Sequence, residues 1–301
     1  MINVYEAVDS NKRKSLVVVL LFIIFISLAA YVIARAMGFG LGFIGVALIF
    51  SGLMSFASYY AGDKIILSLA KAHPIDKKRE KLLYQVVQNL SLAAGLPMPK
   101  IYVTEDQSPN AFATGRDPEH AALCVTRGLL ERLDRTELEG VIGHELSHIG
   151  NYDTRLLAIV TILVGMIALL GDWFLQSVWW GGGRSDRDEE GSAGALFFAL
   201  ALLVAILSPI LAQLIQLAVS RRRESLADAS SVKLTRQPEG LIKALEKISA
   251  DPRQLSTANR ATASLYIINP LKGHQVVGWL SHLWDTHPPI SERIKALQAM
   301  E

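Results

Sequence analysis

The sequence has a single cysteine, Cys124, among its 301 residues, and its formal net charge is only +2. One cysteine cannot form an internal disulfide, so stability must come from packing, membrane insertion or a bound metal. The small net charge provides no strong field for a nucleic acid or an acidic partner. The sequence therefore excludes a small disulfide-stabilised scaffold and predicts no nucleic-acid partner. Cys124 lies in an apolar run at 121–126, where an inert core role is expected.

Charged residues are scarce, at 19% of the chain, where a soluble domain usually has about 25%. They are missing altogether from three stretches, at 15–34, 36–62 and 191–220. Each stretch is long enough to cross the hydrocarbon core of a membrane as a helix, which takes about 20 residues. With a mean hydropathy of +0.31, the chain is predicted to be a multi-pass membrane protein and not an ordinary cytosolic enzyme.

We expect about four transmembrane helices, arranged as two hairpins. The third is the weakest, because Asp172 ends its uncharged run, which is confined to 156–171. The expected spans are Ser15–Ala34, Phe39–Ala61, Leu156–Leu175 and Gly194–Ser220.

Positive charges flank these spans on one side and are few in the short connecting loops, so the positive-inside rule orients the chain. Both termini and the segment 62–155 are predicted to face the cytoplasm. Residues 176–193 then form an external loop, with Trp173, Trp179 and Trp180 as interfacial anchors or, alternatively, as a binding cluster. The flanking charges are Lys12, Arg13, Lys14, Lys64, Lys71, Lys77, Lys78, Arg79, Arg155, Arg221, Arg222 and Arg223.

The expected organisation alternates membrane and soluble parts. Residues 1–62 form the N-terminal segment and first hairpin, 63–155 the first soluble part, 156–220 the second hairpin and 221–301 the second soluble part. Apolar spacing predicts helices at 81–96, 136–150, 225–234, 240–250 and 290–299. Strands are predicted at 100–103 and 121–126, with a short one at 110–114 between them. The soluble parts therefore read as one cytoplasmic α+β domain.

The predicted helix at 136–150 contains the sequence HELSH, from His144 to His148. Residues four apart lie on one face of a helix, so both imidazoles can bind the same tetrahedral metal. Glu145 can project toward a water that zinc has acidified and accept its proton. Charged residues on both sides of this motif argue against a site buried within the bilayer.

A third ligand is available in the sequence RRRESLAD at 221–228. Glu224 and Asp228 are four apart, so one can bind the metal while the other holds the free nitrogen of a ligand histidine. The alternative is a pair of solvated acids beside three arginines. Topology favours a metal ligand, because two intervening spans return the chain to the side of the membrane where His148 lies.

These motifs resemble the HtpX-like membrane metalloproteases, relatives of the eukaryotic CAAX-prenyl endopeptidase. The matching segments are HELSHIGNYD at 144–153, ESLAD at 224–228, NAFATG at 110–115 and THPPISERI at 286–294, in the family's order. The resemblance implies a zincin-type protease domain with one zinc ion per chain. It assigns the metal to His144, His148 and Glu224, and the general base to Glu145.

The resemblance also suggests supporting roles, each with a plainer alternative. Asp228 would hold a ligand histidine, and Asp153 would position the end of the active-site helix or be an ordinary polar cap. His287 would stabilise the oxyanion or mark the start of a helix. The strand of Asn110, Ala111, Phe112 and Ala113 would bind an extended substrate, or form a tight strand and turn.

The implied function is zinc-dependent hydrolysis of misfolded or damaged membrane proteins in the inner membrane of a bacterium, with cytosolic proteins as a further class of substrate. Two alternatives remain at this point: CAAX-type processing of prenylated proteins, and a zinc-binding scaffold without protease activity. An intact Glu145 argues against the scaffold, because a structural zinc needs no base beside its ligands. The lipid bilayer is an expected partner, whereas the oligomeric state cannot be inferred from the sequence.

Overall fold

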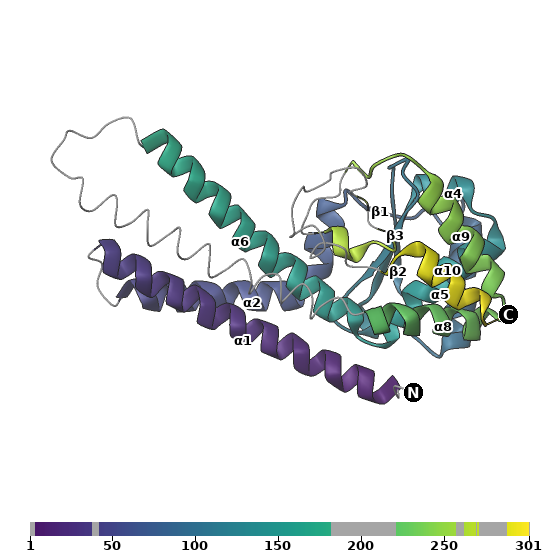
Figure 1. Ribbon diagram of the computed structural model, residues 1–301, viewed down its shortest axis with the longest axis horizontal. Helices are drawn as coiled ribbons and strands as arrows, with labels where there is room; N and C mark the ends of the chain where they lie inside the picture. The colour runs from purple at the N-terminus through teal and green to yellow at the C-terminus, as the bar shows by residue number, and fades with distance from the viewer. Residues whose placement is uncertain are drawn as a thin grey trace.

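Three long helices project in one direction from a compact body that contains the sheet (Figure 1). The computed structural model describes residues 4–37, 42–181, 221–256, 262–268, 270 and 288–300. The predicted fourth span, most of the external loop and the side chains of its tryptophans lie outside the described residues. The three long helices are α1 (Val4–Met37), α2 (Gly42–Leu69) and α6 (Asp153–Gly181).

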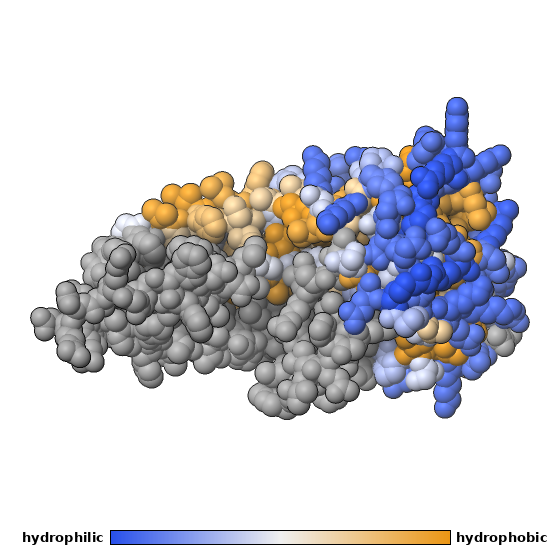
Figure 2. All heavy atoms as spheres, turned by 90° about the horizontal axis from the view of Figure 1, so that it is seen from above, coloured by the Kyte–Doolittle hydropathy of each residue, from blue (hydrophilic) through white to orange (hydrophobic). Residues whose placement is uncertain are grey.

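The projecting helices carry exposed apolar side chains, whereas the compact body is mainly hydrophilic outside (Figure 2). On α2, Val46, Ile49 and Phe56 are each more than 60% exposed, as expected for a surface that faces lipid. Among the described residues, α2 alone is long and apolar enough from Ile44 to Leu69 to cross a membrane by itself. The helices α5 and α6 meet that test only together, as a pair bent by 81°.

All three of these helices run further than the sequence pattern predicts, and α1 extends beyond both ends of the expected span Ser15–Ala34. We expected the second span to end near Ala61, but α2 continues through Asp63 and Lys64 to Leu69. Nothing in this stretch breaks a helix until Lys71, which adopts a φ of 51°. Likewise α6 passes the expected end at Leu175 and reaches Gly181, where a run of glycines begins.

The sheet has four strands in the order β1-β2-β4-β3. Parallel pairing joins β2 and β4, while β1 and β3 are antiparallel to their neighbours and form the two edges. The predicted strands are confirmed, and β1 is an additional short one. Their bounds are β1 (His73–Pro74), β2 (Lys100–Thr104), β3 (Ala111–Thr114) and β4 (Ala122–Thr126).

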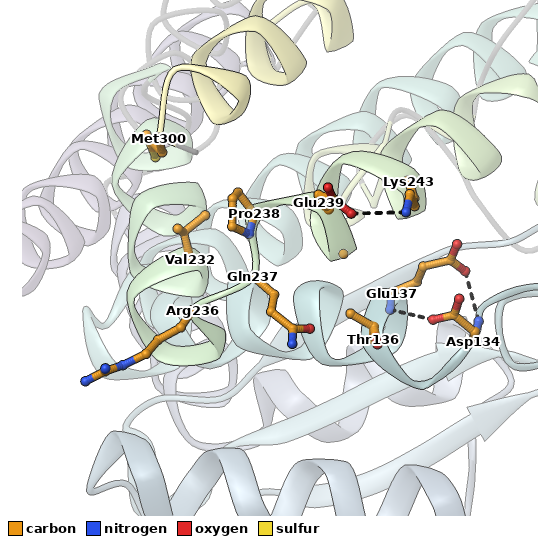
Figure 3. A pocket seen from close by; sticks show the side chains of 11 residues that line it. Asp134, Thr136, Glu137, Val232, Arg236, Gln237, Pro238, Glu239, Lys243 and Met300 are labelled. Atoms are coloured by element: carbon orange, nitrogen blue, oxygen red, sulfur yellow. Dashed lines mark hydrogen bonds and ion pairs between the residues drawn. The ribbon is translucent and has the colours of Figure 1, made fainter.

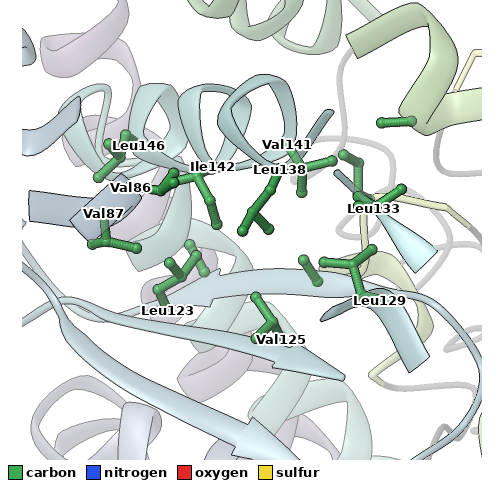
Figure 4. Packing of buried hydrophobic residues seen from close by; sticks show 14 of the residues in the cluster. Val86, Val87, Leu123, Val125, Leu129, Leu133, Leu138, Val141, Ile142 and Leu146 are labelled. Carbon is green, nitrogen blue, oxygen red and sulfur yellow. The ribbon is translucent and has the colours of Figure 1, made fainter. Parts of the chain in front are cut away.

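The core of the body lies between one face of the sheet and two helices, α3 (Lys81–Ala94) and α5 (Arg135–Gly150). In Figure 4, Leu138, Val141 and Ile142 of α5 lie above Leu123 and Val125 of β4. A capping box between Asp134 and Glu137 starts α5 at the expected place. The other helices of the body are α4 (Arg127–Arg132), α8 (Arg221–Thr235), α9 (Pro238–Ala250) and α10 (Ile290–Gln298), with short turns η1 (Pro118–His120) and η2 (Ala263–Leu265).

The opposite face of the sheet packs against the ends of the long helices. Phe112 and Cys124 share a buried cluster with Ile66 of α2, Ala158 of α6 and Tyr266. Both faces of β4 are therefore covered, which explains its continuous apolar sequence. The long helices α2 and α6 are thus joined to the sheet beside β3, where the candidate site lies.

Candidate metal centre

The two histidines of the HELSH sequence lie near the end of α5 and face the same point. Their side chains are buried, and the Nε2 atoms of His144 and His148 are 3.1 Å apart. Glu224 of α8 completes the group, with Oε1 3.5 Å from Nε2 of His148 and Oε2 3.6 Å from Nε2 of His144. The three ligand atoms all lie within 4.8 Å of one another, as the sequence predicted.

The close packing of α8 on α5 positions Glu224. A Cβ atom at Gly143 would be 2.8 Å from Oγ of Ser231, so only glycine allows the helices to lie this close. The Ser231 hydroxyl donates to the carbonyl of Gly140, at 2.7 Å. Because Glu224, Asp228 and Ser231 share one face of α8, this contact directs both acids toward the histidines.

Each histidine also has a buried carboxylate at its other ring nitrogen. Nδ1 of His144 is 2.9 Å from Oδ1 of Asp228, and Nδ1 of His148 is 2.9 Å from Oδ2 of Asp153. Such carboxylates determine which nitrogen carries the proton and leave Nε2 available to a metal. The structure brings Asp153 into contact with a histidine ring, a more specific placement than the helix end suggested by the sequence.

Glu145 points into the same enclosed space and is 2% exposed. Burial, and to a lesser extent the negative charge of Glu224, raise its pKa to about 7, although the charge of His148 and the backbone N–H of Ala113, which donates to the carboxylate, oppose the shift. A carboxyl group with a pKa near neutrality can both accept and return a proton at physiological pH. Glu145 therefore has the properties of a general base.

The two histidines differ in pKa. Burial lowers the pKa of His144, and the nearby guanidinium of Arg293 adds to this effect. For His148 burial also lowers the pKa, but the hydrogen bond to Asp153 and the charges of Glu224 and Asp153 outweigh it and raise the pKa to about 9. The surroundings therefore favour the protonated form at His148 and the neutral form at His144.

Arg293 on α10 is a site residue that sequence reasoning missed. It is 3% exposed, and its guanidinium donates to both oxygens of Asp228, at 2.9 and 2.7 Å. Nη1 also donates to the carbonyl of Ile267, at 3.1 Å, and lies 3.8 Å from Oε2 of Glu224. The THPPISERI segment contains this residue, but nothing in its spacing indicates a contact with Asp228, which lies far earlier in the chain.

Two further polar side chains were also missed, and both contact Asp153. Asn11 of α1 donates to Oδ1 at 2.7 Å, and Arg223 of α8 lies 3.1 Å from the same oxygen. The sequence pattern predicts a topology anchor at Arg223 and indicates no role for Asn11. No local pattern indicates a contact between segments so distant in the sequence.

The strand β3 lies at the edge of the sheet beside Glu145, but the chain itself covers that edge. The carbonyl of Asn110 accepts from Thr126 of β4, so the backbone of Ala111 faces outward and its carbonyl accepts from Ile267, at 3.0 Å. The Asn110 side chain donates to the carbonyl of Ile268, at 2.9 Å. Phe112 packs edge-on against Tyr266, with ring centroids 5.1 Å apart. The segment 262–268 therefore lies along the proposed substrate strand.

The space around Glu145 is consequently small, with a cavity of about 10 Å³. This is about the space of one water. Besides the site residues, its walls are Thr154 and Leu157 of α6 and the segment from Ser264 to Ile267. His287, the expected oxyanion donor, lies outside the described residues.

A larger and more open hollow of about 740 Å³ lies at the other end of α5, between its first turn and the loop that joins α8 to α9 (Figure 3). Ion-paired Glu239 and Lys243 form part of its wall, with the capping pair Asp134 and Glu137 below. Among the described residues, neither histidine nor cysteine lines it.

Comparison with known proteins agrees with this geometry. The sequence model of peptidase family M48 matches residues 77–301. The chain is 46% identical to "Protease HtpX homolog" of Dictyoglomus thermophilum over 299 residues, which cover 98% of this chain and 94% of that protein. It is 42% identical to the protein of the same name from Caldanaerobacter subterraneus, over 98% of this chain and 97% of that one.

A solved structure, that of S. mikatae Ste24p, is similar with a TM-score of 0.48 and 19% identity. The similarity covers 91% of this chain but only 62% of that protein. The family match and the relatives lead to one conclusion. The chain belongs to peptidase family M48 and is a membrane metalloprotease.

Proposed function

We propose that the chain is an integral-membrane zinc endopeptidase that holds one zinc ion with His144, His148 and Glu224. The convergence of these three ligands carries the proposal. A tetrahedral zinc with bonds of about 2.0–2.1 Å separates neighbouring ligand atoms by about 3.4 Å. The two Nε2 atoms are 3.1 Å apart, and each lies 3.5 or 3.6 Å from its nearer carboxylate oxygen of Glu224, close to this requirement. Two imidazoles and one carboxylate, with a further position open, are a common donor set of catalytic zinc.

Bound zinc supplies a Lewis acid that polarises the scissile carbonyl and lowers the pKa of water. Glu145 takes the proton from the attacking water and delivers it to the leaving nitrogen of the peptide bond. The raised pKa of its carboxyl group, about 7, suits both steps. Asp228 and Asp153 hold the two histidine rings with Nε2 toward the metal. His287 is proposed to donate a hydrogen bond to the oxyanion.

The substrate is proposed to bind as an extended strand along β3, at the residues Asn110 to Ala113. The backbone N–H of Ala113 donates to the carboxylate of Glu145, which places this strand beside the proposed base and supports the assignment. Ile267 already uses the carbonyl of Ala111, so a substrate strand has to displace the segment 262–268. Protein substrates follow from the family; misfolded membrane proteins are the proposed class, and prenylated CAAX proteins the alternative.

The proposed topology has four spans in a bacterial inner membrane, with both termini and the site in the cytoplasm. The exposed apolar side chains of α1 and α2 support insertion of these helices. A reporter fused after Arg187 tests the orientation, because external signal is expected there. Cytoplasmic signal would overturn the topology.

Cleavage of an unfolded protein in detergent tests the chemistry. The protein is purified with a chelator to limit self-cleavage and is then given zinc. Glu145→Gln is expected to lower turnover by at least about 10²–10⁴-fold while one zinc still binds, because only the proton carrier is lost. Glu139→Gln is the matched control, since Glu139 is on the same helix but is paired at the surface with Arg135.

The other outcomes separate the alternatives. If the wild type and Glu145→Gln both bind zinc and neither cuts any substrate, the scaffold without protease activity is correct. If Glu145→Gln cuts as fast as the wild type, Glu145 is not the base. Selective cleavage of a prenylated peptide over an unfolded membrane protein would establish the CAAX alternative.

A further inference from the structure

The joint between α5 and α6 lies directly beside the metal centre. Three residues, Asn151 to Asp153, turn the chain through the 81° bend between the two helices. Tyr152 adopts a φ of 60°, a left-handed conformation that is uncommon for a residue with a side chain. Such a conformation persists where the surroundings hold it in place. The neighbours of this joint therefore control where the last turn of α5, with His148, is directed.

The N-terminal helix provides those neighbours. Nδ2 of Asn11 donates to the carbonyl of Asn151, at 2.9 Å, and to Oδ1 of Asp153, at 2.7 Å. The next residue, Lys12, places its ammonium 4.6 Å from the centre of the Tyr152 ring. Asn11 is 2% exposed, so both of these hydrogen bonds are shielded from water. One turn of α1 thus contacts all three residues of the joint.

The contact with Asp153 reaches the metal centre through one carboxylate. Oδ2 of Asp153 faces Nδ1 of His148, while Oδ1 faces Asn11 and Arg223. Because both oxygens have partners, the plane of the carboxylate is fixed, and with it the orientation of the imidazole. A buried carboxylate that loses a donor rotates toward another partner. Such a rotation moves the acceptor that faces Nδ1 of His148.

We propose that Asn11 is a positioning residue for the zinc site, so that the first membrane helix forms part of the active centre. The inference rests on the proposed function, since it assumes that His148 binds zinc. It adds a residue 140 positions away from the joint, on a helix outside the region that the family model matches. It also implies that a displacement of α1 changes the orientation of His148 at the metal site.

Zinc affinity of the full chain in detergent, measured by competition with a chelator, tests the proposal. Asn11→Ala and Asn11→Leu are both expected to weaken zinc binding about tenfold, the lower end of the range for partners of metal ligands. Asn11→Leu keeps the branched shape of the side chain and replaces the amide, with its donor, by methyl groups. Ser15→Ala is the matched control, because Ser15 is buried one turn later on α1 and, among the described residues, its hydroxyl donates within its own helix to the carbonyl of Asn11.

The same variants in an Asp153→Ala background show whether Asn11 acts through that carboxylate. The expected result is that Asn11→Ala then has no further effect on zinc affinity, and that in the parent it lowers kcat with KM unchanged. Wild-type affinity in Asn11→Leu would overturn the proposal in favour of packing. An undiminished effect in the Asp153→Ala background would overturn it too. A wild-type chain that binds no zinc would refute the proposed function instead.

Discussion

The two histidines of the metal centre are oriented by similar devices that come from different parts of the molecule. His144 faces Asp228, which is held by Arg293 of the C-terminal helix. His148 faces Asp153 at the start of α6, which is held by Asn11 of α1 and Arg223 of α8. One half of the centre therefore depends on contacts within the compact body, and the other half also on how the long helices α1 and α6 meet that body.

The halves also differ in charge. Burial and the cation of Arg293 lower the pKa of His144, whereas Asp153 and Glu224 outweigh burial and raise the pKa of His148. Similar geometry thus produces opposite pKa shifts, because a buried cation lies beside one ring and two anions act on the other. Two histidines with the same kind of carboxylate partner therefore differ in the direction of their pKa shifts.

The largest difference is expected when the cation of each half is removed. Arg293→Ala leaves Asp228 buried without its guanidinium and should lower the free energy of unfolding of the metal-free protein by about 3–5 kcal/mol. Arg223→Ala should cost less, because Asp153 keeps the donor of Asn11. Thermal unfolding in detergent measures both, with Arg135→Ala, which breaks an exposed pair, as the control. Equal losses for Arg293→Ala and Arg223→Ala would show that Asp228 and Asp153 depend equally on their arginines.

The dependence of zinc binding on pH sharpens the electrostatic difference. The pKa of His148, about 9, lies above its ordinary value of 6.5, so its proton stabilises the metal-free fold fully below pH 6.5, and this stability is lost as the pH rises through 9. Zinc has to displace that proton, so its affinity should rise about tenfold per pH unit between about pH 7 and 9. Chelator competition across this range gives the slope. Asp153→Ala is expected to flatten it, and a flat wild-type profile would contradict the assignment.

A smaller effect is expected from Gly143→Ala, which tests whether α8 has to lie against α5. The new Cβ would be 2.8 Å from Oγ and 3.3 Å from Cα of Ser231, so α8 has to shift. We expect a loss of about 1–3 kcal/mol in the free energy of unfolding. Zinc affinity should fall with it, since Glu224 and Asp228 move together. Gly52→Ala on α2, where a Cβ meets nothing within 4 Å, is the control. Unchanged zinc affinity in Gly143→Ala would separate the helix contact from the site.

The smallest effect is expected at Cys124, which belongs to neither half. Its side chain is fully buried on the opposite face of the sheet, and burial raises the pKa of the thiol. A thiol reagent should leave the folded protein unmodified and react after denaturation. Cys124→Ala should bind zinc as the wild type does. Rapid modification of the folded chain would show that this face opens.

The parts of the site that the sequence predicted follow from local spacing. His144, Glu145 and His148 lie within two turns of one helix, and Glu224 and Asp228 lie on one face of another. The strands and helices of the body were predicted for the same reason, since their apolar periods are local. The path out and back across the membrane further predicted that the two helices meet. Which side chains share a face of one helix or strand follows from the backbone geometry of that element alone.

Arg293, Asn11 and the cover of β3 by Ile267 could not be predicted in this way. Each depends on a hydrogen bond between segments far apart in the chain, and one buried polar residue on a helix looks like another until its partner is known. The prolonged end of α2 was missed because charge patterns locate the edge of a membrane and not the end of a helix.

The sequence by itself determined the family, and it predicted the ligand types, the base beside them and a set of membrane helices, because these depend on residue identity and short-range periodicity. Only the tertiary structure decided which carboxylate faces which histidine, what holds each carboxylate and how little space is left beside Glu145. Those features arise from the packing of distant segments. A buried polar group needs a hydrogen-bond partner, and the packing of distant segments determines which groups lie close enough to serve as one.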